Sequence, residues 1–115
     1  MPETPPTLIA INAVLADRVG EFEEWLRSVV VPAIRTQRPD LDGRWRVLRA
    51  TEADDDAVVF AFVCEGGVPE DWDLRPYLEK AHGPEEADRA LERFASMLRG
   101  GQQAWFFEPS ELGRP

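Results

Sequence analysis

The segment Ala57–Glu65 has the sequence AVVFAFVCE, and all but its last residue are apolar. β-Branched and aromatic residues followed by a glycine pair are typical of a buried β-strand. Because successive side chains of a strand point to opposite faces of the sheet, Phe60 and Phe62 lie on one face, with Val59 and Val63 on the other. Both faces of this strand therefore need apolar neighbours.

Three more strands are predicted around this segment. Arg44–Thr51 forms the preceding strand, and the acidic run Asp54–Asp56 connects the two. A connection this short indicates an antiparallel hairpin. Short apolar runs at Thr7–Leu15 (TLIAINAVL) and Gln102–Glu108 predict the first and last strands, and both are again apolar on two faces.

A long amphipathic segment lies between the first two strands. Asp17 is expected to cap a helix whose apolar stripe meets the rest of the protein. Pro32 falls inside this stripe and lacks the N–H that an α-helix needs, so the regular helix should kink or end near Ser28–Val31. The segment Gln37–Gly43, rich in proline and aspartate, predicts a loop. The stripe consists of Phe22, Trp25, Leu26, Val29, Val30 and Ile34.

Two helical segments are predicted between the third strand and the last. Asp71–His82 is expected to form one or two irregular helical turns, interrupted at Pro76. A more regular helix starts at Pro84, because proline is favoured at the first helical position, and ends before Gly100-Gly101. The complete order is β-α-β-β-α-β, which is the ferredoxin-like plan of an α+β protein with a four-stranded antiparallel sheet.

The composition is that of one ordinary soluble domain. The chain has 115 residues, of which 43% are hydrophobic and 30% charged, and this length suits a single hydrophobic core. We place the domain at residues 7–108, between tails at 1–6 and 109–115. The N-terminal tail is unlike a signal peptide, and no apolar run approaches the roughly 18–20 residues of a membrane span, so a cytoplasmic location is expected.

Charge and cysteine content exclude several classes of partner. The 22 acidic and 13 basic residues give a net charge of −9. Such a surface repels phosphate backbones and anionic lipids, so neither nucleic acid nor a membrane is expected as a partner. Cys64 is the single cysteine and His82 the single histidine. An intrachain disulfide and a Cys/His zinc site within one chain are therefore excluded, and no metal site is predicted.

The two-sided strands predict a further layer of protein on the sheet. Two helices cover only one face of a four-stranded sheet, and a solvent-facing antiparallel sheet is usually polar. Large apolar side chains left in water would each forgo about 1.5–3 kcal/mol. We therefore expect a homodimer in which two sheets pack around a two-fold axis. The alternative is a monomer whose apolar face stays exposed or is covered by its tails.

Three residues are candidates for a functional site. Asn12 is the polar residue of an apolar strand, and if Ile9 and Ile11 meet the helices, Asn12 points into the space between two sheets. A buried amide needs partners, which can equally be structural. His82 suits proton transfer or metal ligation, although a histidine at a helix end more often bonds a carbonyl group or water. Trp72 can form the wall of a pocket or anchor a loop.

The element order, the two-sided strands and the Trp-plus-His segment before the second long helix resemble the dimeric α/β-barrel superfamily, over about residues 7–108. In that superfamily, two ferredoxin-like protomers close their sheets into a barrel. Its members include cofactor-independent quinone-forming monooxygenases of antibiotic biosynthesis, heme-degrading monooxygenases, small lactone isomerases and proteins of no known activity. The resemblance implies a homodimer and leaves the function open.

The heme-degrading branch of this superfamily is similar to the chain in the order of an Asn, a Trp and a His. By that resemblance, His82 would be the axial iron ligand, Asn12 would hydrogen-bond near bound dioxygen and Trp72 would press the porphyrin out of plane. Pro76 and Pro84 depart from the pattern, because they reshape the segment that must orient His82.

Three functional hypotheses follow. The first is a homodimer that binds a hydrophobic small molecule, or acts on it as a cofactor-independent monooxygenase. In this hypothesis a phenolic or enolic substrate lies between sheet and helices, Asn12 and Trp72 position it, and His82 or Tyr77 moves a proton. The second is a non-catalytic dimerisation or binding module. The third is a heme-binding or heme-degrading monooxygenase, and only this one uses a cofactor. The residues expected to contact the substrate are Tyr77, Phe60 and Phe62.

Overall fold

The computed structural model describes residues 6–110 and 112 of the chain. It contains a four-stranded antiparallel sheet in the order β2-β3-β1-β4. With the helical turns grouped, the order along the chain is β-α-β-β-α-β, so the predicted ferredoxin-like α+β fold is confirmed. Most of the tail predicted at 1–6 and part of that at 109–115 lie outside the described residues. The strands are β1 (Thr7–Leu15), β2 (Trp45–Arg49), β3 (Ala57–Glu65) and β4 (Gln103–Phe107).

The helical run after β1 changes type where the sequence predicts a break. The Val31 N–H donates to the Leu26 carbonyl oxygen, five residues earlier, which is the wide turn of a π-helix. This turn ends two residues before Pro32 and gives its ring room, because a proline in an α-helix clashes with the carbonyl group four residues before it. The run therefore continues past the proline. Its parts are a 3-10 turn (Ala16–Arg18), α1 (Val19–Trp25), the π-helical turn (Leu26–Val30) and α2 (Val31–Gln37).

Three local predictions in the helical segments are wrong. Asp17 does not cap the first helix, because it lies inside a 3-10 turn that begins one residue earlier. α3 (Pro39–Asp42) adds a helical turn inside the predicted loop, with Pro39 at the first helical position, where its missing N–H costs no hydrogen bond. α4 (Leu74–His82) is regular rather than interrupted, because Pro76 lies in its first turn, where N–H groups have no acceptor within the helix.

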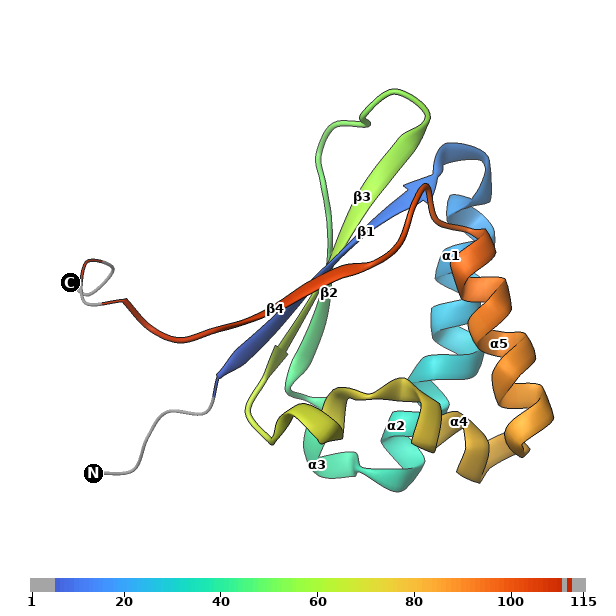
Figure 1. Cartoon of the computed structure of the whole chain (residues 1–115), viewed down its shortest axis with the longest axis vertical. Helices are drawn as coiled ribbons and strands as arrows, with labels where there is room; N and C mark the ends of the chain where they lie inside the picture. The colour runs from blue at the N-terminus through green and yellow to red at the C-terminus, as the bar shows by residue number, and fades with distance from the viewer. Residues whose placement is uncertain (1–5, 111, 113–115) are drawn as a thin grey trace.

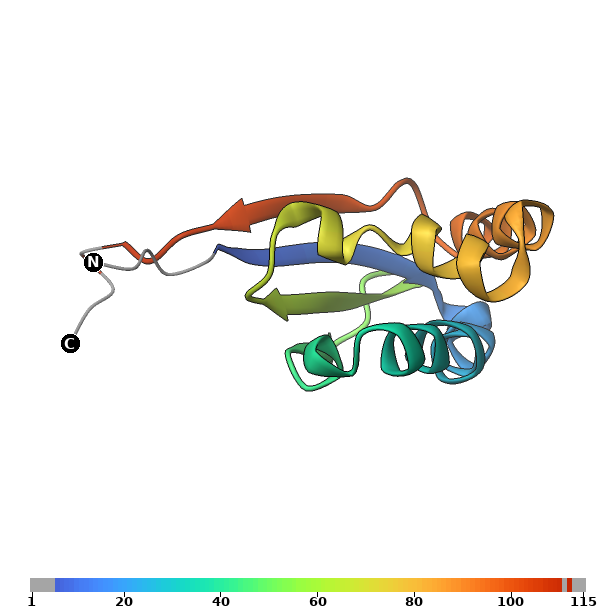
Figure 2. The same cartoon turned by 90° about the horizontal axis from the view of Figure 1, so that it is seen from below.

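All the helices lie on one side of the sheet (Figure 1). After a 3-10 turn at Pro69–Trp72 and α4, the chain forms α5 (Pro84–Ser96), which begins at the predicted proline. Figure 2 shows the run from α1 to α2 lying beside the pair α4 and α5. Within the described residues, every helix is too short or too polar to cross a bilayer.

The helices cover the face of the sheet that holds Asn12 and Val14. Val14 packs in the main hydrophobic core with Phe22 of α1, and Asn12 has no exposed surface. The expectation that Ile9 and Ile11 meet the helices, with Asn12 on the opposite face, is therefore wrong. A strand that is apolar on both sides gives no information about which side the helices occupy, and this is the reason for the error.

Among the residues that the structure describes, no helix lies over the other face of the sheet (Figure 1). On this face, the side chains of Leu48, Trp105 and Phe107 are 47%, 51% and 47% exposed. The strand register places Trp105 directly opposite Ile9 of β1, so an apolar strip crosses from the edge strand to the centre of the sheet. We call these residues, with Ile11, the open sheet face. The prediction of a sheet that is apolar on two sides is confirmed.

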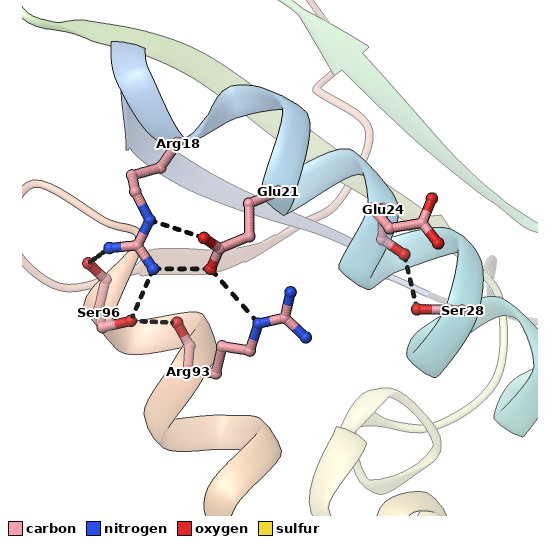
Figure 3. Close-up of polar contacts among 6 residues, drawn as sticks. All are labelled: Arg18, Glu21, Glu24, Ser28, Arg93 and Ser96. Carbon is pink, nitrogen blue, oxygen red and sulfur yellow. Dashed lines mark hydrogen bonds and ion pairs between the residues drawn. The ribbon is translucent and has the colours of Figure 1, made fainter.

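A network of charged side chains joins α1 to α5 (Figure 3). The Arg18 guanidinium donates to both carboxylate oxygens of Glu21, over 3.1 and 2.7 Å, and Arg93 Nε of α5 donates to Glu21 Oε2 over 3.4 Å. Water screens such surface pairs, so each of them contributes little to stability. The rings of Trp25 of α1 and Phe94 of α5 also stack, with their centroids 4.9 Å apart. Together, these contacts hold α1 against α5 over the sheet.

Candidate functional site

A cavity of about 380 Å³ lies between the sheet and the helices, and we call it the main cavity. Its volume is within the range of roughly 300–1,000 Å³ that is typical of small-molecule sites. Residues of β1, β2 and β3 line it on the side of the sheet, and residues of the helical run, of the segment 71–77 and of α5 line the rest. Three of the four tryptophans of the chain line it. Its apolar walls include Trp25, Trp45, Phe62, Trp72, Leu91 and Phe94.

A tight loop after β3 holds Trp72 at the main cavity. The indole Nε1 of Trp72 donates to the Gly66 carbonyl oxygen over 2.8 Å. Gly66 and Gly67 have φ angles of 84° and 71°, in the region that favours glycine. The Asp71 carboxylate accepts the Val68 N–H over 2.9 Å and thereby closes the loop. The ring of Trp72 is therefore fixed by its own chain segment.

The polar groups around Tyr77 are also bonded within the protein. Tyr77 lines the main cavity from α4, and its hydroxyl donates to the Asp71 carbonyl oxygen over 2.7 Å. Burial raises the pKa of Tyr77, so the phenol keeps its proton at neutral pH. The Val68 N–H and the Arg38 guanidinium, 2.7 Å from Asp71 Oδ1, lower the pKa of Asp71. Asp71 is thus a stabilised carboxylate and a weak base.

Cys64 lines the main cavity from β3. Burial raises the pKa of its thiol to about 12. The thiolate is the reactive form of cysteine, so this side chain is a neutral, apolar part of the wall at physiological pH.

Asn12 is not a lining residue of the main cavity. Its Nδ2 group donates to the carbonyl oxygens of Phe60 and Ala10 over 3.3 and 3.4 Å. Its Oδ1 accepts a hydrogen bond from Gln102 Nε2 over 2.8 Å. Gln102, which sequence reasoning missed, does line the cavity. The Asn12 amide therefore makes its hydrogen bonds within the protein, and its connection to the cavity is the hydrogen bond from Gln102.

His82 lies at a different, smaller cavity of about 250 Å³, which Glu86 and Arg89 also line. Trp25 lines both cavities and so lies between them. The buried Trp25 Nε1 has no hydrogen-bond partner among the described residues. A buried donor without an acceptor costs about 1–3 kcal/mol. An oxygen atom of a ligand that reached this N–H would remove that cost.

The structure thus brings together Trp72, Tyr77 and Phe62 of the predicted site residues. Phe60 packs in the core instead, with its ring 5.0 Å from that of Phe22. Of the two residues predicted to move a proton, Tyr77 lines the main cavity and His82 does not.

The described residues do not fit the arrangement of a heme-degrading site. That arrangement needs His82, Asn12 and Trp72 around one cavity, and only Trp72 lines the main cavity. The buried Asn12 amide has its hydrogen bonds within the protein, so it leaves no donor for bound dioxygen. In the part of the chain that the structure describes, no group of three or more His, Cys, Asp or Glu side chains is suited to a metal ion.

Comparison with known proteins identifies the fold. No family model matches the sequence, and no curated protein does. A solved structure from Caulobacter crescentus CB15, described as a "putative antibiotic biosynthesis monooxygenase", has a TM-score of 0.55 at 12% identity, over 95% of this chain and 92% of the other. A protein of the same description from Nitrosomonas europaea has a TM-score of 0.54 at 12% identity, over 96% and 95%. The predicted resemblance is confirmed at the level of the fold.

Proposed function

We propose that this chain forms a homodimer that binds a hydrophobic aromatic molecule in the main cavity and oxidises it as a cofactor-independent monooxygenase. The proposal rests on one observation, the cavity walled by Trp25, Trp45 and Trp72 between sheet and helices. The oxidation is suggested by the fold, which is shared with the two solved structures described as monooxygenases.

The cavity defines the class of ligand. A volume of about 380 Å³ equals roughly a dozen water molecules at about 30 Å³ each, so it has room for a ligand of about ten non-hydrogen atoms. Aromatic walls favour a flat ring, which can pack in offset or edge-to-face contact with the indoles. The charged residues Asp71, Asp73 and Arg75 also line the cavity, and they suit a ligand with one polar edge.

A cofactor-free oxidation needs a substrate that itself reduces dioxygen. A deprotonated phenol can do this, because its ring carbon forms a bond to one oxygen atom. Loss of the proton on that carbon and cleavage of the O–O bond then give a quinone and water. For 1-naphthol, the balance is one phenol and one O₂ giving one 1,4-naphthoquinone and one water. The substrate supplies all four electrons.

Asp73 is the residue to which we assign removal of the phenol proton. It lines the main cavity, and its Oδ1 accepts the Arg75 N–H over 3.2 Å at the start of α4. Within the described residues, Asp73 takes part in no ion pair, in contrast to Asp71. Tyr77 is protonated and already donates, so in this scheme it positions the ring rather than accepting a proton.

A non-catalytic binding module is the second candidate, and a specific observation favours it. The polar atoms of Trp72 and Tyr77 that face this region are already bonded to backbone carbonyl groups. General acid–base catalysis needs groups that can exchange a proton with the ligand. A cavity that binds a ligand without reacting with it would have walls whose polar groups are already hydrogen-bonded within the protein.

The open sheet face supports the proposed homodimer. Three large side chains there are about half exposed: Leu48, Trp105 and Phe107. Burying a fully exposed side chain of this kind contributes about 1.5–3 kcal/mol, so covering these half-exposed ones contributes about half of that each. A second copy of the same sheet supplies a matching apolar surface.

Calorimetric titration with 1-naphthol tests the binding. We expect micromolar affinity and a matching change in tryptophan fluorescence, because three of four tryptophans line the cavity. Ala10→Leu should weaken binding at least tenfold, since Ala10 is a buried lining residue and a larger side chain fills the space. Ala95→Leu adds the same atoms on the exposed side of α5 and is the matched control. Equal binding by both variants would place the ligand elsewhere.

An oxygen electrode separates the two candidates. The monooxygenase should consume one O₂ per naphthoquinone formed, without added metal or flavin, and Ala10→Leu and Asp73→Asn should slow this reaction. Tight binding without oxygen consumption would support the binding module instead.

A further inference from the structure

The orientation of the Asn12 amide is determined by its surroundings. Its Nδ2 lies 3.3 Å from the Phe60 carbonyl oxygen and 3.4 Å from that of Ala10. Carbonyl oxygens only accept hydrogen bonds, so the NH₂ end of the amide must face them. The other end, Oδ1, therefore faces Gln102.

The orientation of Gln102 follows from that of Asn12. Because Oδ1 of Asn12 only accepts, Gln102 must present its NH₂ group to it, and the two atoms are 2.8 Å apart. Oε1 of Gln102 accepts no hydrogen bond from the described residues, so it is available to accept one from a ligand. Gln102 lines the main cavity, where Trp72 and Tyr77 have already donated their polar hydrogens to backbone carbonyl groups.

We propose that Gln102 is a specificity-determining residue of the main cavity, which accepts a hydrogen bond from the ligand, and that Asn12 is the residue that positions it. This inference rests on the proposed function. It defines the ligand more narrowly, as an aromatic molecule with a hydroxyl or N–H donor. The hydrogen bond to Gln102 belongs to the bound, protonated ligand, before Asp73 takes the phenol proton in the oxidation. The same molecule with a methyl ether in place of the hydroxyl is expected to bind less tightly, because it cannot donate to Oε1 of Gln102.

Paired titrations with 1-naphthol and 1-methoxynaphthalene test this inference. A neutral hydrogen bond contributes enough for a preference of roughly threefold to tenfold, so the wild-type chain should prefer the naphthol by this factor. Gln102→Leu should reduce the preference to about one. Asn12→Leu should reduce it as well, because Gln102 would then lose the contact that orients its amide. Gln103→Leu is the matched control. Gln103 pairs with Ile11, so its side chain lies on the open sheet face and not on the face that lines the cavity.

The ratio of the two affinities distinguishes the possible results. A positioning role predicts loss of discrimination, whereas a merely structural role of Asn12 would change the melting temperature and leave the ratio intact. If Asn12→Leu does not fold, Gln102→Leu still tests the specificity. Equal binding of both ligands by the wild-type chain would overturn the inference but leave the cavity as a binding site. Binding of neither would reject the proposed function itself.

Discussion

Cys64 shows how burial changes the pKa of a single side chain in the cavity wall. Burial raises the pKa of its thiol from 9.0 to about 12. The neutral thiol is thus favoured by folding, so this contribution to stability is present below pH 9 and is lost as the pH rises toward 12. In the native protein, Cys64 should react with iodoacetamide at a rate that rises tenfold per pH unit between pH 8 and 10.

The urea-unfolded chain is the control for this experiment. Its thiol titrates near the ordinary value, so its reaction rate should level off above about pH 9. A native rate that levels off at the same pH would show that Cys64 is not buried as described.

Asn12 shows how far a residue can be interpreted without its neighbours. A polar side chain in an apolar strand indicates that something must bond to it, and this was visible in the sequence. Its partner was not, because Gln102 is 90 residues away. The two meet only through the pairing of β1 with β4, one step beyond the pair Ile11–Gln103. Strand register depends on long-range packing, which no local pattern encodes.

The loop between β3 and α4 is the element on which the position of Trp72 depends. A Cβ atom added to Gly67 would lie 2.7 Å from Asp71 Oδ2, and its φ of 71° is strained for any other residue. Gly67→Ala should therefore destabilise the protein by about 1–3 kcal/mol in chemical denaturation. Gly43→Ala is the matched control, because Gly43 has a φ of −88° and no atom within 4 Å of its added Cβ. Similar losses in both variants would contradict this description of the loop.

Prolines account for both the successful and the wrong helix predictions. The position of Pro32 predicted a break in the first helical run, and the structure has its π-helical turn there. The interruption predicted at Pro76 is absent, because that proline lies in the first turn of α4. The effect of a proline depends on where the helix begins, and Asp73 begins α4 by accepting the Arg75 N–H, a start that the pattern of apolar residues did not reveal.

For the whole molecule, the association of two copies is the decisive expectation. Light scattering should give about 26 kDa, twice the 13.0 kDa of one chain. Trp105→Glu should convert this species to a monomer, because it places a charge in the centre of the apolar strip. Phe106→Glu is the control, since Phe106 is 47% exposed in the same strand but points to the other face of the sheet. A wild-type monomer at micromolar concentration would rule out the dimer.

The alternation of apolar residues was sufficient to predict the element order, the antiparallel sheet and its two apolar faces. It did not predict which face the helices cover, because Ile9 and Asn12 lie in a strand with apolar residues on both sides. A site between the sheet and the helices was predicted for a phenolic substrate, but most of its walls were not, since they depend on how Trp25 and Trp72, 47 positions apart in the sequence, pack against the same sheet.

The edge strand β4 has a consequence for solubility. Its sequence QAWFF carries no charge, and within residues 6–110 one side of its backbone has no neighbouring strand. Such edges are templates for aggregation unless like charge keeps molecules apart. A net charge of −9 provides that repulsion at neutral pH. Near the isoelectric point of about 4.5 the repulsion vanishes, and we expect precipitation there rather than a clear solution of folded protein.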